Sequence, residues 1–252
     1  MPRSFAVDSH GGQRWKYSDT VMTNLAEKLQ IDGYALLTQV VDAESLSAAT
    51  DDLAQLMTRG HRRLAGLRNI LKLSAVVRDL ARSPSFTELV EPILGKDAKV
   101  VRGLYFDKRA EANWKVAWHQ DLSIAVKERS EIAGYGPWSV KAGITHVQPP
   151  AALLEQMLTL RLHLDDTDET NGALRVLPGT HRLGRLSAER LQEYSQRMEI
   201  HVCNVQHGGV MLMRTLLAHS SSTSQLLRRR RVIHLEYCGA ELPDGLEWDE
   251  AV

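Results

Sequence analysis

A short segment in the middle of the chain places an imidazole close to a carboxylate. The segment reads Trp118-His119-Gln120-Asp121 and lies in a stretch that has the pattern of a β-strand. Side chains two residues apart on a strand point to the same face, so His119 and Asp121 would present their ligand atoms together. One more neutral donor would complete a facial triad, the arrangement typical of non-haem Fe(II) oxygenases. The motif alone is weak evidence, because its spacing recurs by chance in many proteins.

A second histidine and aspartate with the same spacing, His163 and Asp165, compete with the first pair. Acidic and polar residues follow this second pair at once, from Asp166 to Glu169. Such a sequence is typical of a polar strand face that runs into a surface loop. We therefore favour a structural interpretation for the second pair and a metal-binding one for the first.

The third candidate ligand is His219, which stands directly before three serines. A histidine in such a setting is more often a surface residue than a ligand. However, Arg230 follows eleven residues later, at the start of an apolar strand. A dicarboxylate that chelates a metal needs a cation for its far carboxylate, and a guanidinium can bind a carboxylate through two hydrogen bonds. The hydroxyl of Ser221 would add a donor to the same carboxylate.

Four consecutive arginines, Arg228 to Arg231, suggest an alternative, a basic patch for nucleic acid or phosphate. The run is short, and no aromatic residues are interleaved with it. At the strand period its members also point alternately to opposite faces. We therefore expect solvated arginines with one of them turned inward.

Composition and charge narrow the class of protein. Lys plus Arg and Asp plus Glu both number 31, so the net charge favours neither nucleic acid nor an anionic membrane as a partner. No apolar run approaches the roughly 20 residues that span a bilayer, and residues 1–12 lack the apolar core of a secretion signal. We expect a cytoplasmic protein with a small-molecule substrate; the oligomeric state stays open. Two buried free thiols are favoured for Cys203 and Cys238, with one disulfide as the alternative.

The first third of the chain has the apolar spacing of helices. Apolar residues recur every four positions from Val21 to Leu29. Asp42 is placed to cap a second helix that Gly60 would end. The pair Ser83-Pro84 predicts the start of a third helix, which Gly95 would close.

From about Lys99 onward the pattern changes to short runs with a period of two. The clearest run, Leu158 to Leu164, predicts a half-buried strand, and Asn171-Gly172 predicts a tight hairpin turn after it. The segment from Lys127 to Pro149 predicts a long loop over the mouth of a barrel, a candidate lid. Helices followed by roughly eight strands indicate an α+β protein with a jelly-roll core of two facing sheets.

Taken together, the motifs resemble those of the phytanoyl-CoA dioxygenase family of Fe(II)/2-oxoglutarate enzymes. The matching stretch runs from about Asp32 to Tyr237. Its strongest pieces are WHQD at 118–121, NGALRVLPGTH at 171–181, and the spacing from His219 to Arg230 ahead of RRVIHLEY. The combination is far more specific than any single piece, and it favours the first histidine and aspartate pair over the second.

The length of the chain and the lack of a linker predict a single dioxygenase domain over residues 1–252, helical over about 1–98. Over about 99–240 the resemblance implies a double-stranded β-helix, the cupin-like jelly-roll, with the N-terminal helices packed on it. It further implies that His119, Asp121 and His219 hold iron. Arg230 and Ser221 would bind the distal carboxylate of 2-oxoglutarate.

Three further residues are expected near the cosubstrate or substrate by the same resemblance. Lys108 matches a basic or polar position on the strand before the metal motif, and Arg102 would share its face. Trp138 falls in the segment after Asp121, where family members place such a residue. The alternatives are a solvated loop edge for Lys108 and ordinary packing for Trp138.

The implied reaction uses Fe(II), 2-oxoglutarate and O2 to hydroxylate a small-molecule substrate, with release of succinate and CO2. Related halogenases lack the carboxylate of the triad, so Asp121 argues for hydroxylation, or a desaturation or cyclisation variant, over halogenation. Two alternatives remain open. One is a jelly-roll metalloenzyme that does not use 2-oxoglutarate, and the other is a non-catalytic binding module of the same fold.

Overall fold

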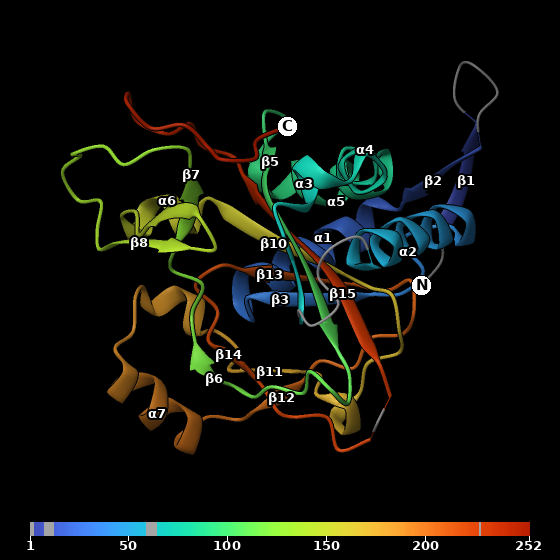
Figure 1. Ribbon diagram of the computed structural model, residues 1–252. Helices are drawn as coiled ribbons and strands as arrows, with labels where there is room; N and C mark the ends of the chain where they lie inside the picture. The colour runs from blue at the N-terminus through green and yellow to red at the C-terminus, as the bar shows by residue number, and fades with distance from the viewer. Residues whose placement is uncertain (1–2, 8–12, 59–64, 227) are drawn as a thin grey trace.

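The computed structural model of the protein describes all residues except 1–2, 8–12, 59–64 and 227. Helices gather in the first hundred residues and antiparallel strands in the rest (Figure 1). The helices are α1 (Asp19–Ile31), α2 (Ala43–Thr58), α3 (Ile70–Leu73), α4 (Ala75–Ala81), α5 (Pro84–Leu94), α6 (Ala151–Glu155) and α7 (Ala188–Arg197). The strands are β1 (Arg3–Val7), β2 (Gln13–Tyr17), β3 (Tyr34–Leu37), β4 (Gly66–Arg68), β5 (Lys99–Lys108), β6 (Val116–His119), β7 (Ile124–Val126), β8 (Trp138–Lys141), β9 (Ile144–Val147), β10 (Met157–His163), β11 (Leu174–Val176), β12 (His201–Val202), β13 (Val210–Arg214), β14 (His219–Ser221) and β15 (Arg230–Cys238).

Two antiparallel sheets form the core. The larger sheet has six strands in the order β3-β13-β10-β15-β5-β4, and the smaller has four in the order β12-β11-β14-β6. The smaller sheet lies below the larger one in Figure 1, with α7 beside it. Two further sheets have no strand in common with these two, the hairpin β1-β2 and the three-stranded sheet β7-β9-β8, which packs against the larger sheet through buried residues. The predicted α+β jelly-roll is confirmed.

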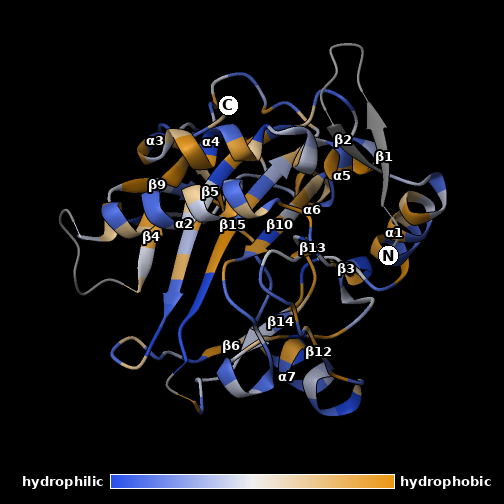
Figure 2. Ribbon diagram, turned by 90° about the vertical axis from the view of Figure 1, so that its right-hand side faces the viewer, coloured by the Kyte–Doolittle hydropathy of each residue, from blue (hydrophilic) through white to orange (hydrophobic). Residues whose placement is uncertain are grey.

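The larger sheet has one apolar and one polar face. On β10 the side chains of Leu158, Leu160 and Leu162 belong to the hydrophobic core that the N-terminal helices complete. Arg161 and His163 alternate with them and point to the opposite face, toward the smaller sheet. The helices carry both hydrophobic and hydrophilic residues, as Figure 2 shows, which is the amphipathic pattern of helices that cover a sheet.

The prediction of a half-buried strand was wrong for β10, because all seven of its residues are buried. The strand lies in the middle of the larger sheet, paired with β13 on one side and β15 on the other. One face is covered by helices and the other by the second sheet. The polar half of the alternating pattern therefore faces an internal space rather than solvent.

The predicted helix signals are confirmed where the structure describes them. The carboxylate of Asp42 accepts a hydrogen bond from the backbone N of Ser45 at 2.8 Å and so caps α2. Helix α5 begins at Pro84 and is closed by Gly95, which adopts φ 94°. The predicted end of α2 at Gly60 lies outside the described residues.

The predicted hairpin at Asn171-Gly172 was wrong. Residues Glu169–Asn171 form a 3-10 turn, and β10 and β11 on either side of it belong to different sheets. The side chain of Asp168 accepts from the backbone N of Thr170 at 2.8 Å, and the Asn171 side chain accepts from the backbone N of Asp168 at 2.8 Å. These side-chain bonds offer the backbone an alternative to hairpin pairing.

The segment from Lys127 to Pro149 is not the long loop that its composition predicted. It holds β8 and β9, which pair with each other and, through β9, with β7. The turn between β8 and β9 consists of Ala142 and Gly143, with φ 52° and 79°. Two such residues form the tight turn of a hairpin, but the pair lacks the usual Asn-Gly signature, so sequence inspection missed it.

Two expectations from composition can be compared with the structure. In the part of the chain that the structure describes, no helix is long and apolar enough to cross a membrane. Cys203 and Cys238 are both buried and free, as the favoured interpretation expected.

Candidate metal centre

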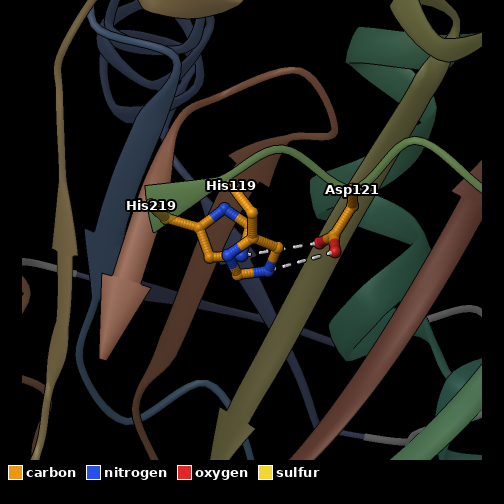
Figure 3. A group of neighbouring side chains, drawn as sticks. All are labelled: His119, Asp121 and His219. Carbon is orange, nitrogen blue, oxygen red and sulfur yellow. Dashed lines mark ion pairs between the residues drawn. The ribbon is translucent and has the colours of Figure 1, made fainter. Parts of the chain in front are cut away.

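Three side chains converge between the two sheets (Figure 3). His119 ends β6 and His219 begins β14, and the two residues stand directly opposite each other in antiparallel register. The Nε2 atoms of His119 and His219 lie 3.8 Å and 3.7 Å from the two carboxylate oxygens of Asp121. Ligand atoms of all three residues lie within 4.8 Å of one another. This spacing allows one metal ion to contact all three.

Asp121 lies beyond the end of β6, so strand alternation is not what brings it to His119. Its backbone N donates to the carbonyl of Thr215 at 3.3 Å. The preceding residue anchors the segment more firmly. The amide of buried Gln120 donates to the carbonyls of Gly184 and Leu216, at 2.8 and 2.7 Å, and accepts from the backbone N of Leu186 at 2.8 Å. Sequence inspection gave no role to Gln120.

Both imidazoles are oriented by backbone carbonyls. The Nδ1 atom of His119 lies 2.9 Å from the carbonyl oxygen of Ala117, and Nδ1 of His219 lies 2.9 Å from that of Leu217. A proton on Nδ1 donates to each carbonyl and leaves the lone pair on Nε2, the atom that faces Asp121. Metal-binding histidines are typically fixed in this way by a second hydrogen bond.

The protonation states also suit a cation. Burial alone would raise the pKa of Asp121, but attraction to His219, His234 and His119 outweighs it and lowers the pKa to about 2. Burial lowers the pKa of His219 to about 4, although Asp121 opposes the shift. Asp121 is therefore ionised and His219 neutral at neutral pH, the forms that bind metals. In addition, Oδ2 of Asp121 is buried and has no hydrogen-bond partner among the described residues. The donor set fits Fe(II).

A cavity of about 400 Å³ opens next to these ligands and is lined by residues of both core sheets. On its wall lies Arg230, whose side chain is buried. Neither Nε nor one terminal nitrogen of Arg230 has a hydrogen-bond partner among the described residues. Burial, together with nearby Arg161, lowers the pKa of Arg230 to about 9. A buried guanidinium without an anion is costly, so this position fits the far carboxylate of a metal-bound dicarboxylate.

Ser221 lines the same cavity, and Lys108 stands behind it. The Ser221 hydroxyl donates to the carbonyl of Gly172 at 2.8 Å and accepts from Nζ of Lys108 at 3.1 Å. Lys108 also donates to the carbonyl of Ser222 at 2.6 Å and is fully buried, so it is not at a solvated loop edge. Burial and Arg230 lower the pKa of Lys108 to about 7. Lys108 thus supports Ser221 rather than lining the cavity.

The structure does not bring Trp138 to the described lining of the cavity. Its ring is partly buried against a hydrophobic cluster that includes Val147 and Leu154. The guanidinium of Arg129 lies 5.8 Å from the ring centroid. The geometry is that of ordinary packing, and a contact of Trp138 with cosubstrate or substrate stays a prediction.

The second histidine and aspartate pair, His163 and Asp165, makes hydrogen bonds within the protein instead of forming a metal site. Nδ1 of buried His163 lies 2.9 Å from the hydroxyl of Thr167, and burial lowers the pKa of His163 well below its usual range. Asp165 accepts hydrogen bonds from the guanidinium of Arg231 at 2.6 and 2.9 Å. The side chains of His163 and Asp165 thus have separate partners, and neither belongs to the group of metal-binding side chains formed by His119, Asp121 and His219.

The arginine run behaves as its strand period predicted. Arg228 pairs with Asp168, and Arg231 pairs with Asp165. Arg229 binds buried Asp107 through two hydrogen bonds of 2.7 and 2.8 Å. Arg230 alone of the four lines the cavity. Three of the four arginines are therefore neutralised by separate aspartates, and the run does not form a basic patch.

A chain of hydrogen bonds along the cavity wall was not predicted. Arg161 approaches Nδ1 of His234 at 2.7 Å, and Nε2 of His234 lies 3.3 Å from the carboxylate of Glu236. Arg102 donates to the same carboxylate at 3.0 Å and approaches Nε2 of His146 at 3.2 Å. The signal was present in the alternating polar positions of β10 and β15. It was misread because those positions were expected to face solvent.

Comparison with known proteins places this geometry in a family. The family model of phytanoyl-CoA dioxygenase (PhyH) matches residues 29–232. An ectoine dioxygenase of Bordetella bronchiseptica is 22% identical over 181 residues, which are 66% of this chain and 52% of that protein. The chain thus spans about half the length of the curated relative that it matches.

Solved structures show the same fold. The epimerase SnoN from nogalamycin biosynthesis, in complex with Fe3+, alpha ketoglutarate and nogalamycin RO, superposes with a TM-score of 0.69 at 16% identity. The match covers 90% of this chain and 92% of that one. EctD from S. alaskensis with 2-oxoglutarate and 5-hydroxyectoine gives 0.66 at 18% identity, over 88% of this chain and 78% of that one. The chain belongs to the phytanoyl-CoA dioxygenase (PhyH) family.

Proposed function

We propose that this protein is a non-haem Fe(II)- and 2-oxoglutarate-dependent dioxygenase that hydroxylates a small molecule. The observation that carries the proposal is the joint presence of two features in one cavity. One is the cluster of His119, Asp121 and His219, and the other is the unpaired guanidinium of Arg230. We further propose that residues 1–252 act as one dioxygenase domain. The membership of the family supports the same reaction class.

His119, Asp121 and His219 would hold the iron through two neutral nitrogens and one carboxylate, which leaves room for further ligands. When bound, Fe(II) would supply the chemistry that activates O2, the oxidant: one oxygen atom would convert 2-oxoglutarate to succinate with release of CO2, and the other would be inserted into a substrate C–H bond. Arg230 would grip the distal carboxylate of 2-oxoglutarate and so fix the orientation of the cosubstrate. Ser221 would add a hydrogen bond after its hydroxyl turns away from the carbonyl of Gly172.

The surrounding residues keep this site dry and ordered. His219 and Arg230 are 4% and 3% exposed, so little water reaches the end of the cavity where the distal carboxylate would lie. His119 is more open, which leaves a side for substrate to approach the metal. Low exposure strengthens the electrostatic grip of Arg230 on an anion, because the effective dielectric constant is lower than in water.

The experiment is an anaerobic titration of Fe(II)-loaded protein with 2-oxoglutarate, observed by visible absorption. A weak charge-transfer band should appear in the wild-type protein as the chelate forms. It should be lost in His219→Ala and retained in His207→Ala, which removes an exposed histidine that does not line the cavity. Circular dichroism and iron analysis of each variant separate loss of the site from loss of the fold.

The alternative functions predict other results. A jelly-roll enzyme that does not use 2-oxoglutarate would bind a metal through the same three residues but give no band with this cosubstrate. A binding module without chemistry would give neither the band nor succinate when iron, ascorbate and a broad panel of substrates are supplied. Hydroxylation itself requires a product that has gained one oxygen atom, which mass spectrometry detects.

A further inference from the structure

The cavity beside the metal ligands carries an excess of positive charge. Within the described part of the chain, two carboxylates line it, those of Asp121 and Glu236. The cationic side chains of the lining are Arg68, Arg102, Lys141, Arg161 and Arg230. Fe(II) would bring two positive charges and 2-oxoglutarate two negative ones, so their binding leaves the excess unchanged. The space that remains for a substrate is therefore cationic.

Two of the five cations already have partners, and a third is assigned to the cosubstrate. Arg230 faces the place proposed for the distal carboxylate of the cosubstrate. Arg161 is bonded to His234, and Arg102 to Glu236 and His146. The donors of Arg161 and Arg102 are thus partly engaged within the protein, and these two residues have fewer hydrogen bonds to offer a ligand.

Arg68 and Lys141 are different. Both residues pair through their backbones within a sheet, but neither side chain makes a hydrogen bond or an ion pair with any residue outside the masked ranges. Both are exposed at the mouth of the cavity, so a ligand can reach them. Free cations at the entrance of a cavity attract anions and raise their local concentration.

The two residues come from separate sheets and reach one space. Arg68 ends β4 and stands directly opposite Leu104 of β5, two residues along from Arg102 on the same face. Lys141 ends β8, next to the tight turn that leads into β9. Burial lowers the pKa of Lys141, and the nearness of Arg102 and Arg68 lowers it further, against a smaller opposite effect of Asp121 and Glu236. Three like charges thus repel one another here, and an anion between them would relieve the repulsion.

We propose that the substrate of this site is a small anion, whose carboxylate or phosphate group is held between Arg68 and Lys141. The proposal rests on the proposed function, because the remainder of the substrate must reach the metal. A guanidinium and an ammonium that converge on one oxyanion form charge-assisted hydrogen bonds, which are the strong ones. A volume of about 400 Å³ suits a small molecule rather than a large conjugate.

The test uses protein loaded with Ni(II) and 2-oxoglutarate, which prevents turnover, and measures binding by calorimetry and thermal shift. The probes are matched pairs, each an acid with its neutral counterpart. Phenylacetate with phenylacetamide represents carboxylates, and phenyl phosphate with phenol represents phosphates. The wild-type protein should bind at least one acid more tightly than its neutral partner. The preferred class tells which oxyanion the site takes.

The variant Arg68→Met/Lys141→Met should bind that acid roughly tenfold more weakly or worse, with the neutral partner unaffected. The control Lys127→Met/Arg129→Met removes the same charge from side chains that do not line the cavity. It should behave like the wild-type protein. The proposal is overturned if the wild-type protein shows no preference for acids. It is also overturned if the preference for acids persists in Arg68→Met/Lys141→Met.

The same protein samples also test the proposed dioxygenase function independently of substrate binding. The Fe(II)/2-oxoglutarate band should be unchanged in Arg68→Met/Lys141→Met, since neither residue is assigned to iron or cosubstrate. Loss of acid binding with an intact band therefore concerns the substrate alone. A missing band in the wild-type protein would instead refute the dioxygenase assignment.

Discussion

Lys108 and Arg230 stand directly opposite each other on the paired strands β5 and β15, and both side chains are buried. Like charges in this arrangement are unfavourable, and the pKa of Lys108 falls to about 7, through burial first and Arg230 second. A carboxylate bound to Arg230 would reduce the electrostatic repulsion between the two cations. The charge of Lys108 should therefore be linked to cosubstrate binding.

We predict that the affinity for 2-oxoglutarate falls as the pH rises from 6 to 8. Lys108 is charged below a pH of about 7 and assists the binding of an anion, and above that pH it loses its proton and the assistance. The loss should be roughly tenfold, the size expected for one added charge at a few ångströms. Titrations of the Fe(II) protein at several pH values measure it. Lys108→Met should show weaker binding and a flatter profile; an equally steep profile in this variant would contradict the assignment.

Arg230→Met should weaken 2-oxoglutarate binding by roughly tenfold to a hundredfold, because a charge-assisted hydrogen bond contributes about 1.5 to 3 kcal/mol. Ser221→Ala should cost less, about fivefold, since a neutral hydroxyl donor is weaker. Calorimetry on the metal-loaded protein gives both values. The control is Arg228→Met, whose side chain is exposed and pairs with Asp168 outside the cavity lining. An effect of Arg228→Met as large as that of Arg230→Met would point to net charge rather than to a specific contact.

Gln120→Leu should lower the free energy of unfolding by about 2 to 4 kcal/mol, because it leaves buried backbone groups without their partners. Iron should also bind more weakly, although all three ligands remain, since Gln120 fixes the segment that carries Asp121. Urea unfolding and iron titration check the two effects. The exposed Gln206→Leu serves as the comparison. Unchanged iron affinity in a destabilised Gln120→Leu would limit this residue to a structural role.

Gly172→Ala and Gly143→Ala form a matched pair, since both glycines adopt φ 79°. Each substitution carries the same backbone penalty, roughly 1 kcal/mol. At Gly172 the added Cβ would in addition lie 2.6 Å from the carbonyl of Ser222 and 3.1 Å from Nζ of Lys108, whereas at Gly143 it meets open space. Gly172→Ala should therefore be the less stable variant in urea unfolding and should bind 2-oxoglutarate more weakly. Equal effects at the two positions would show that the contact with Lys108 is unimportant.

Much of the fold could be predicted, because its signals are local. The helix cap at Asp42 and the helix start at Ser83-Pro84 depend on residues within one turn, and the strands show their period over a few positions. The hairpin of Ala142 and Gly143 was missed because a residue other than Asn or Asp supplies one of the two positive φ angles. The exposure of β10 was misjudged because it depends on distant chain segments that cover both faces of the sheet.

Some residues of the candidate site could likewise be predicted from the sequence, and others could not. His119, Asp121 and His219 were found because their types and spacing are shared with a family, and the structure brings them together. Arg161, His234 and Glu236 lie on strands far apart in the chain, so only their pairing in the sheet reveals that they form one network. Lys108 was placed beside the cosubstrate, whereas the structure places it one layer behind, in contact with Ser221.

The two unlike faces of β10 restrict how the chain can vary. A shift of its pairing by one residue would turn Arg161 and His163 into the helix-covered core and bring the leucines to the cavity. Neither face could tolerate the exchange, because burying the charged Arg161 in the apolar core would cost too much free energy. Competing registers of the larger sheet are therefore excluded. Insertion or deletion of a single residue within Met157–His163 should therefore abolish folding. Length changes at the Ala142-Gly143 turn, which lies in exposed surface, should be far better tolerated.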